Sequence, residues 1–199
     1  MFRIGLELEE FCVDNKSKEV VLIPKDSNIP HDGCGWLIEY RSEPCKTIVD
    51  AVFSLKADEY KAKNLLTKFG VTGVRSPVMK PSKDVRMSAR KRFIKSLVKF
   101  NNIYGYKCHK NTLSEAVAAV HISITFSVDG KNGRVNKLWD YADFIRYMDE
   151  AFEKEIAESK RRPGFYEIKS DGRFEYRSLP NNIDLDKLMQ VVSRYRWKY

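Results

Sequence analysis

An alternation of apolar and polar residues at the start of the chain constrains its fold most. At the start of residues 2–13, even-numbered positions carry apolar side chains and odd-numbered positions carry charged side chains or glycine. The first set is Phe2, Ile4, Leu6 and Leu8, and the second is Arg3, Gly5, Glu7 and Glu9. Successive side chains of a β-strand point to opposite faces of the sheet, so this pattern predicts a strand with one buried and one polar face. The same alternation predicts strands within residues 36–43 and 117–128.

Turn signals predict two hairpins. Residues 19–23 follow a polar turn and predict a return strand beside the first strand. The turn Ser170-Asp171-Gly172 predicts a second hairpin, which joins residues 165–169 to residues 173–179. Residues 74–85 contain two prolines and predict a long surface loop.

Apolar residues at helical spacing predict four helices, over residues 47–69, 88–100, 136–160 and 184–197. The first could break near Ala57 and should stop at Gly70, and Asn182 or Asp184 should cap the last. Strands joined by hairpins and helices that cover one face predict an α+β fold. The length fits a single domain over residues 1–199.

Composition limits the partners and the location. The formal charge of +9 favours an anionic partner such as nucleotide, nucleic acid or acidic peptide, although a basic surface that only aids solubility fits equally well. The four cysteines form no C-x-x-C pair, which favours free thiols and a cytoplasmic location. No apolar run approaches the roughly 20 residues of a membrane span, so we expect no membrane partner.

Three predicted strands carry charged groups on their polar faces. Glu7 and Glu9 are two positions apart, so their carboxylates should project the same way about 7 Å from each other. Further candidates on polar faces are Glu39, Arg41, Glu43, His121, Arg173, Glu175 and Arg177. Carboxylates crowded on one face repel each other, and a divalent cation such as Mg²⁺ would compensate them while arginines bind phosphate or carboxylate.

A purely structural interpretation competes with this one. The glutamates could lie on a solvated face and pair with arginines of neighbouring strands. That explanation suits any single pair better than a metal site does. It suits the whole set less well, because ordinary solvent faces are less selective in composition. His121 is a candidate ligand only because these carboxylates accompany it.

Four short motifs resemble the glutamine synthetase/glutamate–cysteine ligase superfamily of carboxylate–amine ligases, which includes bacterial and phage amidoligases. The strand Gly5-Leu6-Glu7-Leu8-Glu9 resembles the opening G-x-E-x-E element of these ligases. The remaining motifs occur in the family's order: Asp32-Gly33 with Glu39-Tyr40-Arg41-Ser42-Glu43-Pro44, Val120-His121-Ile122-Ser123, and Arg173-Phe174-Glu175-Tyr176-Arg177-Ser178-Leu179-Pro180. Together they span nearly the whole chain.

The resemblance implies a curved antiparallel sheet around ATP and Mg²⁺. ATP would phosphorylate a substrate carboxylate, and an amine would attack the acyl phosphate to form an amide, in a small metabolite, a peptide or a protein. The implied metal ligands are Glu7, Glu9, Glu39 or Glu43, His121 and Glu175. Arg41, Arg173 and Arg177 would contact the nucleotide, the last two as catalytic groups. The chain is shorter than typical members and has Ser123 where a second histidine is common.

Two other functions remain open from the sequence. The same fold could have lost turnover and bind nucleic acid or a protein partner through the basic segment of residues 83–95, although a solvated helix face explains that segment too. Alternatively, carboxylate-bound metals could hydrolyse nucleic acid. The R-S-x-P elements and the scarcity of strand aspartates favour the ligase over the nuclease.

Overall fold

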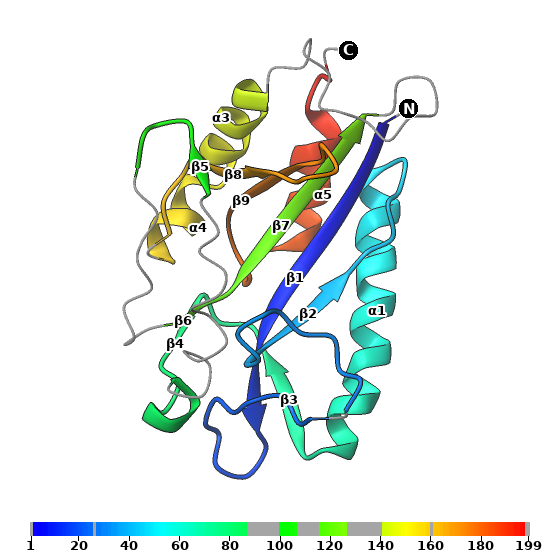
Figure 1. Ribbon diagram of the computed structural model, residues 1–199. Coiled ribbons are helices and arrows are strands. Elements are labelled where there is room, and N and C mark those ends of the chain that lie inside the picture. Colours follow the sequence, from blue (N-terminus) through cyan, green and yellow to red (C-terminus); the bar gives the residue numbers. More distant parts are fainter. Residues whose placement is uncertain are drawn as a thin grey trace.

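The computed structural model describes residues 2–25, 27–86, 100–106, 116–126, 141–159 and 161–197. Its framework is a seven-stranded sheet in which all paired strands are antiparallel. Helices pack against one face of this sheet (Figure 1). The chain is therefore a mixed α/β protein built on antiparallel strands, as the sequence predicts.

The long strand β1 (Phe2–Asp14) is the spine of the sheet. One edge of β1 pairs with β2 (Leu37–Arg41), and the other edge pairs first with β7 (Ala119–Phe126) and then with β3 (Val71–Val74). Figure 1 shows β1 and β7 running side by side along most of their length. The alternation in residues 2–13 therefore predicted the central strand correctly.

The second half of the sheet is the predicted hairpin of β8 (Phe165–Ile168) and β9 (Phe174–Pro180). β9 adds to β7, and the short β5 (Asn101–Asn102) adds to β8. A separate two-stranded sheet joins β4 (Val78–Met79) to β6 (Ala116–Val117). It begins within the segment that the sequence predicted as a surface loop.

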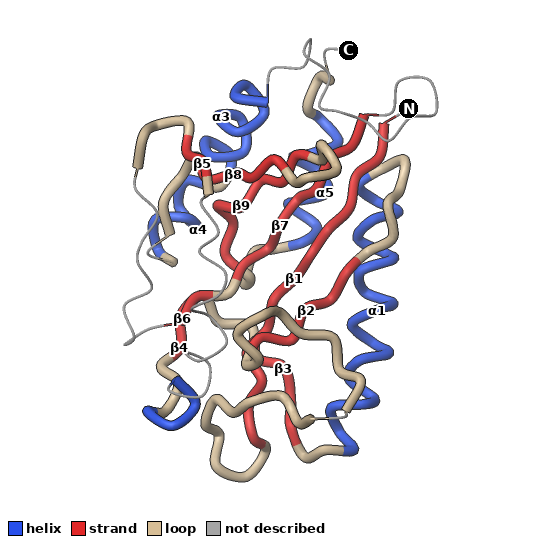
Figure 2. Tube along the Cα trace, viewed as in Figure 1, coloured by secondary structure: helices blue, strands red, loops and turns tan. Residues whose placement is uncertain are grey.

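Within the described residues, four helices pack on one face of the sheet (Figure 2). They are α1 (Ile48–Lys68), α3 (Tyr141–Ala151), α4 (Glu153–Glu158) and α5 (Leu185–Arg194). The Thr47 hydroxyl accepts a hydrogen bond from Asp50 N at the start of α1, and Gly70, with φ of 68°, follows its end. Asp184 caps α5 through Asp186 N, as predicted. None of the helices in the described residues is long and apolar enough to cross a membrane.

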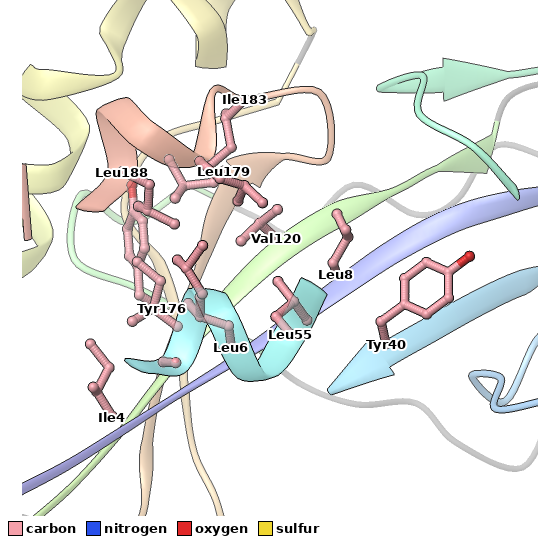
Figure 3. Close-up of a cluster of buried hydrophobic side chains, with 14 of the residues drawn as sticks. Ile4, Leu6, Leu8, Tyr40, Leu55, Val120, Tyr176, Leu179, Ile183 and Leu188 are labelled. Atoms are coloured by element: carbon pink, nitrogen blue, oxygen red, sulfur yellow. The ribbon is translucent and has the colours of Figure 1, made fainter. Parts of the chain in front are cut away.

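The main hydrophobic core lies between the sheet and these helices. Side chains of one parity on β1, β7 and β9 supply its sheet side, among them Leu6, Val120 and Tyr176 (Figure 3). Leu55 of α1 and Leu188 of α5 pack onto them. Burial of one such aliphatic side chain stabilises the fold by about 1.5–3 kcal/mol. The core therefore fixes which alternate residues of each strand face the helices and which face the opposite side of the sheet.

Some sequence predictions need correction. Residues 19–23 form no strand but a single bridge, Val13 with Val20, because β2 already occupies that edge of β1. α1 is continuous through Ala57, and the predicted helix over residues 136–160 is divided at Phe152 into α3 and α4. The predicted helix over residues 88–100 lies outside the described residues except for Phe100, as do residues 127–128, 136–140 and 160 of other predicted elements.

Candidate functional site

The sheet face opposite the helices is polar and hollowed. A cleft of about 360 Å³ opens on it between the β1–β2 pair and the β8–β9 hairpin. Its lining residues carry four carboxylates, four cationic groups and one imidazole: Glu7, Glu9, Asp32, Glu39, Arg41, His121, Lys169, Arg173 and Arg177. Residues far apart in the sequence thus face one shared space.

Strand register brings the groups together. Glu7 is paired with Arg41 of β2 on one side and with His121 of β7 on the other. Glu175 of β9 is paired with Ser123, two residues from His121. The pairing of β7 and β9 shifts between Val120 and Ile122, and such bulges redirect side chains next to functional sites.

Glu7, His121 and Glu175 form a cluster of possible metal ligands in the described residues. One ligand atom from each lies within 4.8 Å of the others. His121 Nδ1 is 3.4 Å from Glu7 Oε2 and 3.9 Å from Glu175 Oε1. Burial and the nearby Arg177 hold the pKa of His121 well below its usual value, so its ring is neutral and keeps a lone pair for a cation.

Glu9 and Asp32 form a second acidic region of the cleft. Glu9 is 9% exposed, and its Oε2 accepts a hydrogen bond from Ala119 N at 2.8 Å. Asp32 Oδ1 accepts hydrogen bonds from Cys34 N and Cys34 Sγ. Burial, and then repulsion by Asp32, raises the pKa of Glu9 to about 8, while burial also raises the pKa of Asp32. These carboxylates carry a cost in the folded protein that a bound cation would relieve.

Cationic side chains contact the other carboxylates of the cleft. On β2, Arg41 pairs with Glu39 and lies 3.6 Å from Glu7 Oε1. Even so, burial and repulsion by Glu7 raise the pKa of Glu39. The guanidinium of Arg41 is largely exposed and can turn toward a ligand in the cleft.

The β8–β9 hairpin carries the other cationic side chains. Arg177 pairs with the fully buried Glu175, and Lys169 Nζ lies 3.1 Å from Glu175 Oε1 and 2.7 Å from Glu167 Oε2. Arg173 Nε is buried with no hydrogen-bond acceptor among the described residues, which suits a site for an anion.

The cleft collects nearly all of the residues that the sequence singled out. With the exception of Glu43, each predicted ligand and arginine either lines it or, for Glu175, belongs to the cluster beside it. Glu43 lies in an exposed loop after β2, where its N–H donates to Ser54 Oγ. Of the two alternatives on the second strand, the structure therefore brings Glu39 into the cleft.

Sequence reasoning missed two residues of the cleft. Asp32 lies in the loop before β2, and its proximity to Glu9 depends on how that loop folds over β1. Its place in an Asp-Gly motif was the available signal. Lys169 immediately precedes the predicted hairpin turn, and its backbone N–H donates to Arg173 O. Its position opposite a predicted phosphate-binding arginine could have revealed it.

A scan against models of known protein families and a search of curated proteins find no match to this chain. The family resemblance of the four motifs therefore stays a prediction. The chemistry of the cleft has to rest on its own residues and their geometry.

Proposed function

We propose that the chain is an ATP-dependent carboxylate–amine ligase that needs a divalent cation and forms an amide through an acyl phosphate. The observation that carries the proposal is the meeting of two kinds of group in one cleft. Glu7, His121 and Glu175 offer ligands for a cation, and arginines of β2 and β9 lie beside them. The four motifs that resemble amidoligases supply the reaction class.

The ligand set fits a hard divalent cation. The two carboxylates of Glu7 and Glu175 and the neutral imidazole of His121 would hold it. Mg²⁺ is the ion that the proposed reaction requires, because nucleotide phosphates and waters complete its coordination. When bound, it would neutralise negative charge on the phosphate oxygens.

The arginines would bind and orient the anionic substrates. A guanidinium presents a planar fork of donors that matches a phosphate or a carboxylate. The Nε–H of Arg173 is buried and has no hydrogen-bond acceptor among the described residues, although Asp171 Oδ2 lies 3.7 Å from it. Arg177 is held over the ring of Phe100, with its Cζ 4.4 Å from the ring centroid. Held in this way, they would place donors where charge develops on the transferred phosphoryl group.

Charge pairing alone explains the cleft less well. Across strands it accounts for Arg41 with Glu7 and for Arg177 with Glu167. Along single strands it accounts for Arg41 with Glu39 and for Arg177 with Glu175. It leaves the buried Glu9 and the half-buried Asp32 lining one cleft with raised pKa values. A face selected only for stability would replace one of these acids with a neutral side chain, because desolvated like charges destabilise a fold.

The test is release of ADP and phosphate from ATP in the presence of Mg²⁺ and pooled carboxylates, with hydroxylamine as the amine so that an acyl phosphate is trapped as a hydroxamate. We expect hydroxamate from the wild type and at least about 100-fold less from Glu7→Gln, because the cation loses a ligand. Glu43→Gln is the matched control and should stay within about threefold of wild type, as surface changes do.

If the wild type and Glu7→Gln are both folded and neither forms hydroxamate, the enzyme proposal is refuted. Loss of activity in Glu43→Gln as large as in Glu7→Gln would refute the assignment of the site. The same proteins should be incubated with DNA and RNA in Mg²⁺, because cleavage that depends on Glu7 would instead support nucleic-acid hydrolysis.

A further inference from the structure

Both oxygens of Glu175 already have partners in the cleft. Ser123 Oγ donates to Oε2 at 3.3 Å, while Lys169 Nζ lies 3.1 Å from Oε1 and Arg177 also pairs with Oε1. His121 Nδ1 is near the same Oε1, at 3.9 Å. A cation that uses Glu175 as a ligand must therefore compete with a positively charged side chain of the protein itself.

Lys169 is the partner that is free to leave. Its side chain is 25% exposed, and a single ammonium at the end of a flexible stem makes the contact. Arg177 is 17% exposed and stacks on Phe100, with 4.4 Å between its Cζ and the ring centroid. Moving the Lys169 ammonium away from Glu175 breaks no stacking and leaves the backbone hydrogen bond from Lys169 N to Arg173 O in place. The ammonium can keep its shorter contact with Glu167 Oε2, at 2.7 Å, as it moves.

The departing ammonium would stay in the cleft, which Lys169 lines together with Arg173 and Arg177. There it would add to the positive charge available to a phosphate or carboxylate. We propose that Lys169 is a displaceable counter-ion of Glu175: a divalent cation releases it, and it then binds the substrate anion, so that cation and anion bind cooperatively. This inference rests on the cation site of the proposed function and adds a coupling between cation and anion binding to it.

Mn²⁺ binding measured by isothermal titration calorimetry tests the competition without turnover. Lys169→Gln removes the competitor, so its Mn²⁺ affinity should rise about tenfold over wild type, within the usual range of coupling energies. Lys169→Arg keeps a cationic partner for Glu175 and should bind Mn²⁺ like the wild type. Circular dichroism and thermal melting of each variant check that it is folded.

Two controls separate displacement from a general change in charge. Arg173→Gln removes a cation from the same cleft that makes no ion pair with Glu175 among the described residues, and its Mn²⁺ affinity should rise less than about threefold. Lys187→Met removes a lysine that pairs with Glu155 on the helix side, and it should leave Mn²⁺ affinity unchanged.

The second half of the proposal, that the released Lys169 binds an anion, is tested with sulfate at constant ionic strength. Sulfate is a tetrahedral anion that chelates Mn²⁺ only weakly. Sulfate should tighten Mn²⁺ binding to wild type about fivefold and to Lys169→Gln less than twofold. The proposal is overturned if no protein binds Mn²⁺, if Lys169→Gln matches the wild type, if Arg173→Gln gains as much affinity, or if sulfate acts equally on both proteins. Ligase activity is scored separately by hydroxamate, so failure of either proposal is recognised independently.

Discussion

Glu9 and Glu10 are neighbours on β1, yet they belong to two buried acidic regions on opposite faces of the sheet. Glu9 lines the cleft with Asp32 and Glu39. Glu10, which is 2% exposed, points to the helix side and contacts Tyr40 and Arg75, and Arg75 also pairs with Glu59. The two regions show what distinguishes a carboxylate buried for stability from one buried for function.

On the helix side each oxygen of Glu10 has a short hydrogen bond. Tyr40 Oη donates to Oε2 at 2.9 Å and Arg75 Nε donates to Oε1 at 2.8 Å, while Arg75 Nη2 reaches Glu59 Oε2 at 2.8 Å. No space remains beside the carboxylate, because a Cβ built on Gly73 would lie 2.0 Å from Glu10 Oε2. This network is closed and leaves no position for a ligand.

The cleft side is open and unevenly compensated. Its carboxylates line a cavity. Within the described residues, Glu9 and Asp32 are held by hydrogen bonds rather than by ion pairs, and burial raises their pKa values. Closed networks rigidify a fold, while open ones keep binding capacity at a cost in stability. Mutations on the helix side should therefore lower the stability of the protein. Mutations in the cleft should lower it only slightly or raise it.

Arg75→Leu should have the largest effect. It leaves Glu10 and Glu59 as buried carboxylates without their shared cation, which should lower the free energy of unfolding by about 3 kcal/mol. Urea denaturation measures this difference. Arg173→Leu removes an arginine from the cleft and should cost less than about 1 kcal/mol; equal losses would show that the two regions do not differ.

Gly73→Ala should come next. Its Cβ would overlap the carboxylate of Glu10 and lie 2.8 Å from Tyr40 Oη, so the network must shift, at about 1–3 kcal/mol. Gly33→Ala is the matched control, because its Cβ would meet nothing within 4 Å. Thermal melting of both variants tests the claim, and an unchanged midpoint for Gly73→Ala would mean that the network is loosely packed.

The contrast between the regions also explains what the sequence could predict. Period-two alternation assigns residues to a face directly, so Glu7, Glu9, His121 and Glu175 were found on the polar face. Glu10 interrupts the apolar parity of residues 2–12 and signals a buried partner, but Arg75 and Glu59 lie too far along the chain for local pattern to identify them. Register and helix packing decide those contacts.

Elements that depend on competition between segments were predicted less well. Residues 19–23 have strand composition but lose the edge of β1 to β2. Periodicity alone did not locate the division at Phe152, which has φ and ψ of −120° and 22°. Asp32 and Lys169 come from a loop and a turn, whose positions follow from tertiary structure rather than from any periodicity.

Glu9→Gln should make the protein more stable at high pH. An acid whose pKa is about 8 when folded and 4.5 in the reference state binds more protons when folded, so its charge lowers stability as pH rises between these values. In EDTA at pH 8.5 the variant should gain about 1–2 kcal/mol over wild type, and the gain should vanish near pH 4.5. Glu10→Gln, tested alongside, should be destabilising instead; a loss for Glu9→Gln at pH 8.5 would contradict the open character of the cleft.

Ser123→Ala should have the smallest effect and gives the finest comparison. The hydroxyl donates to Glu175 at 3.3 Å, a long contact beside stronger partners, so its loss should cost about 0.5 kcal/mol. Tyr40→Phe removes a hydroxyl that donates to Glu10 at 2.9 Å inside the closed network and should cost about 1.5 kcal/mol. Urea denaturation of the two variants under one set of conditions resolves this difference, and a larger loss for Ser123→Ala would mean that Glu175 is held for stability as Glu10 is.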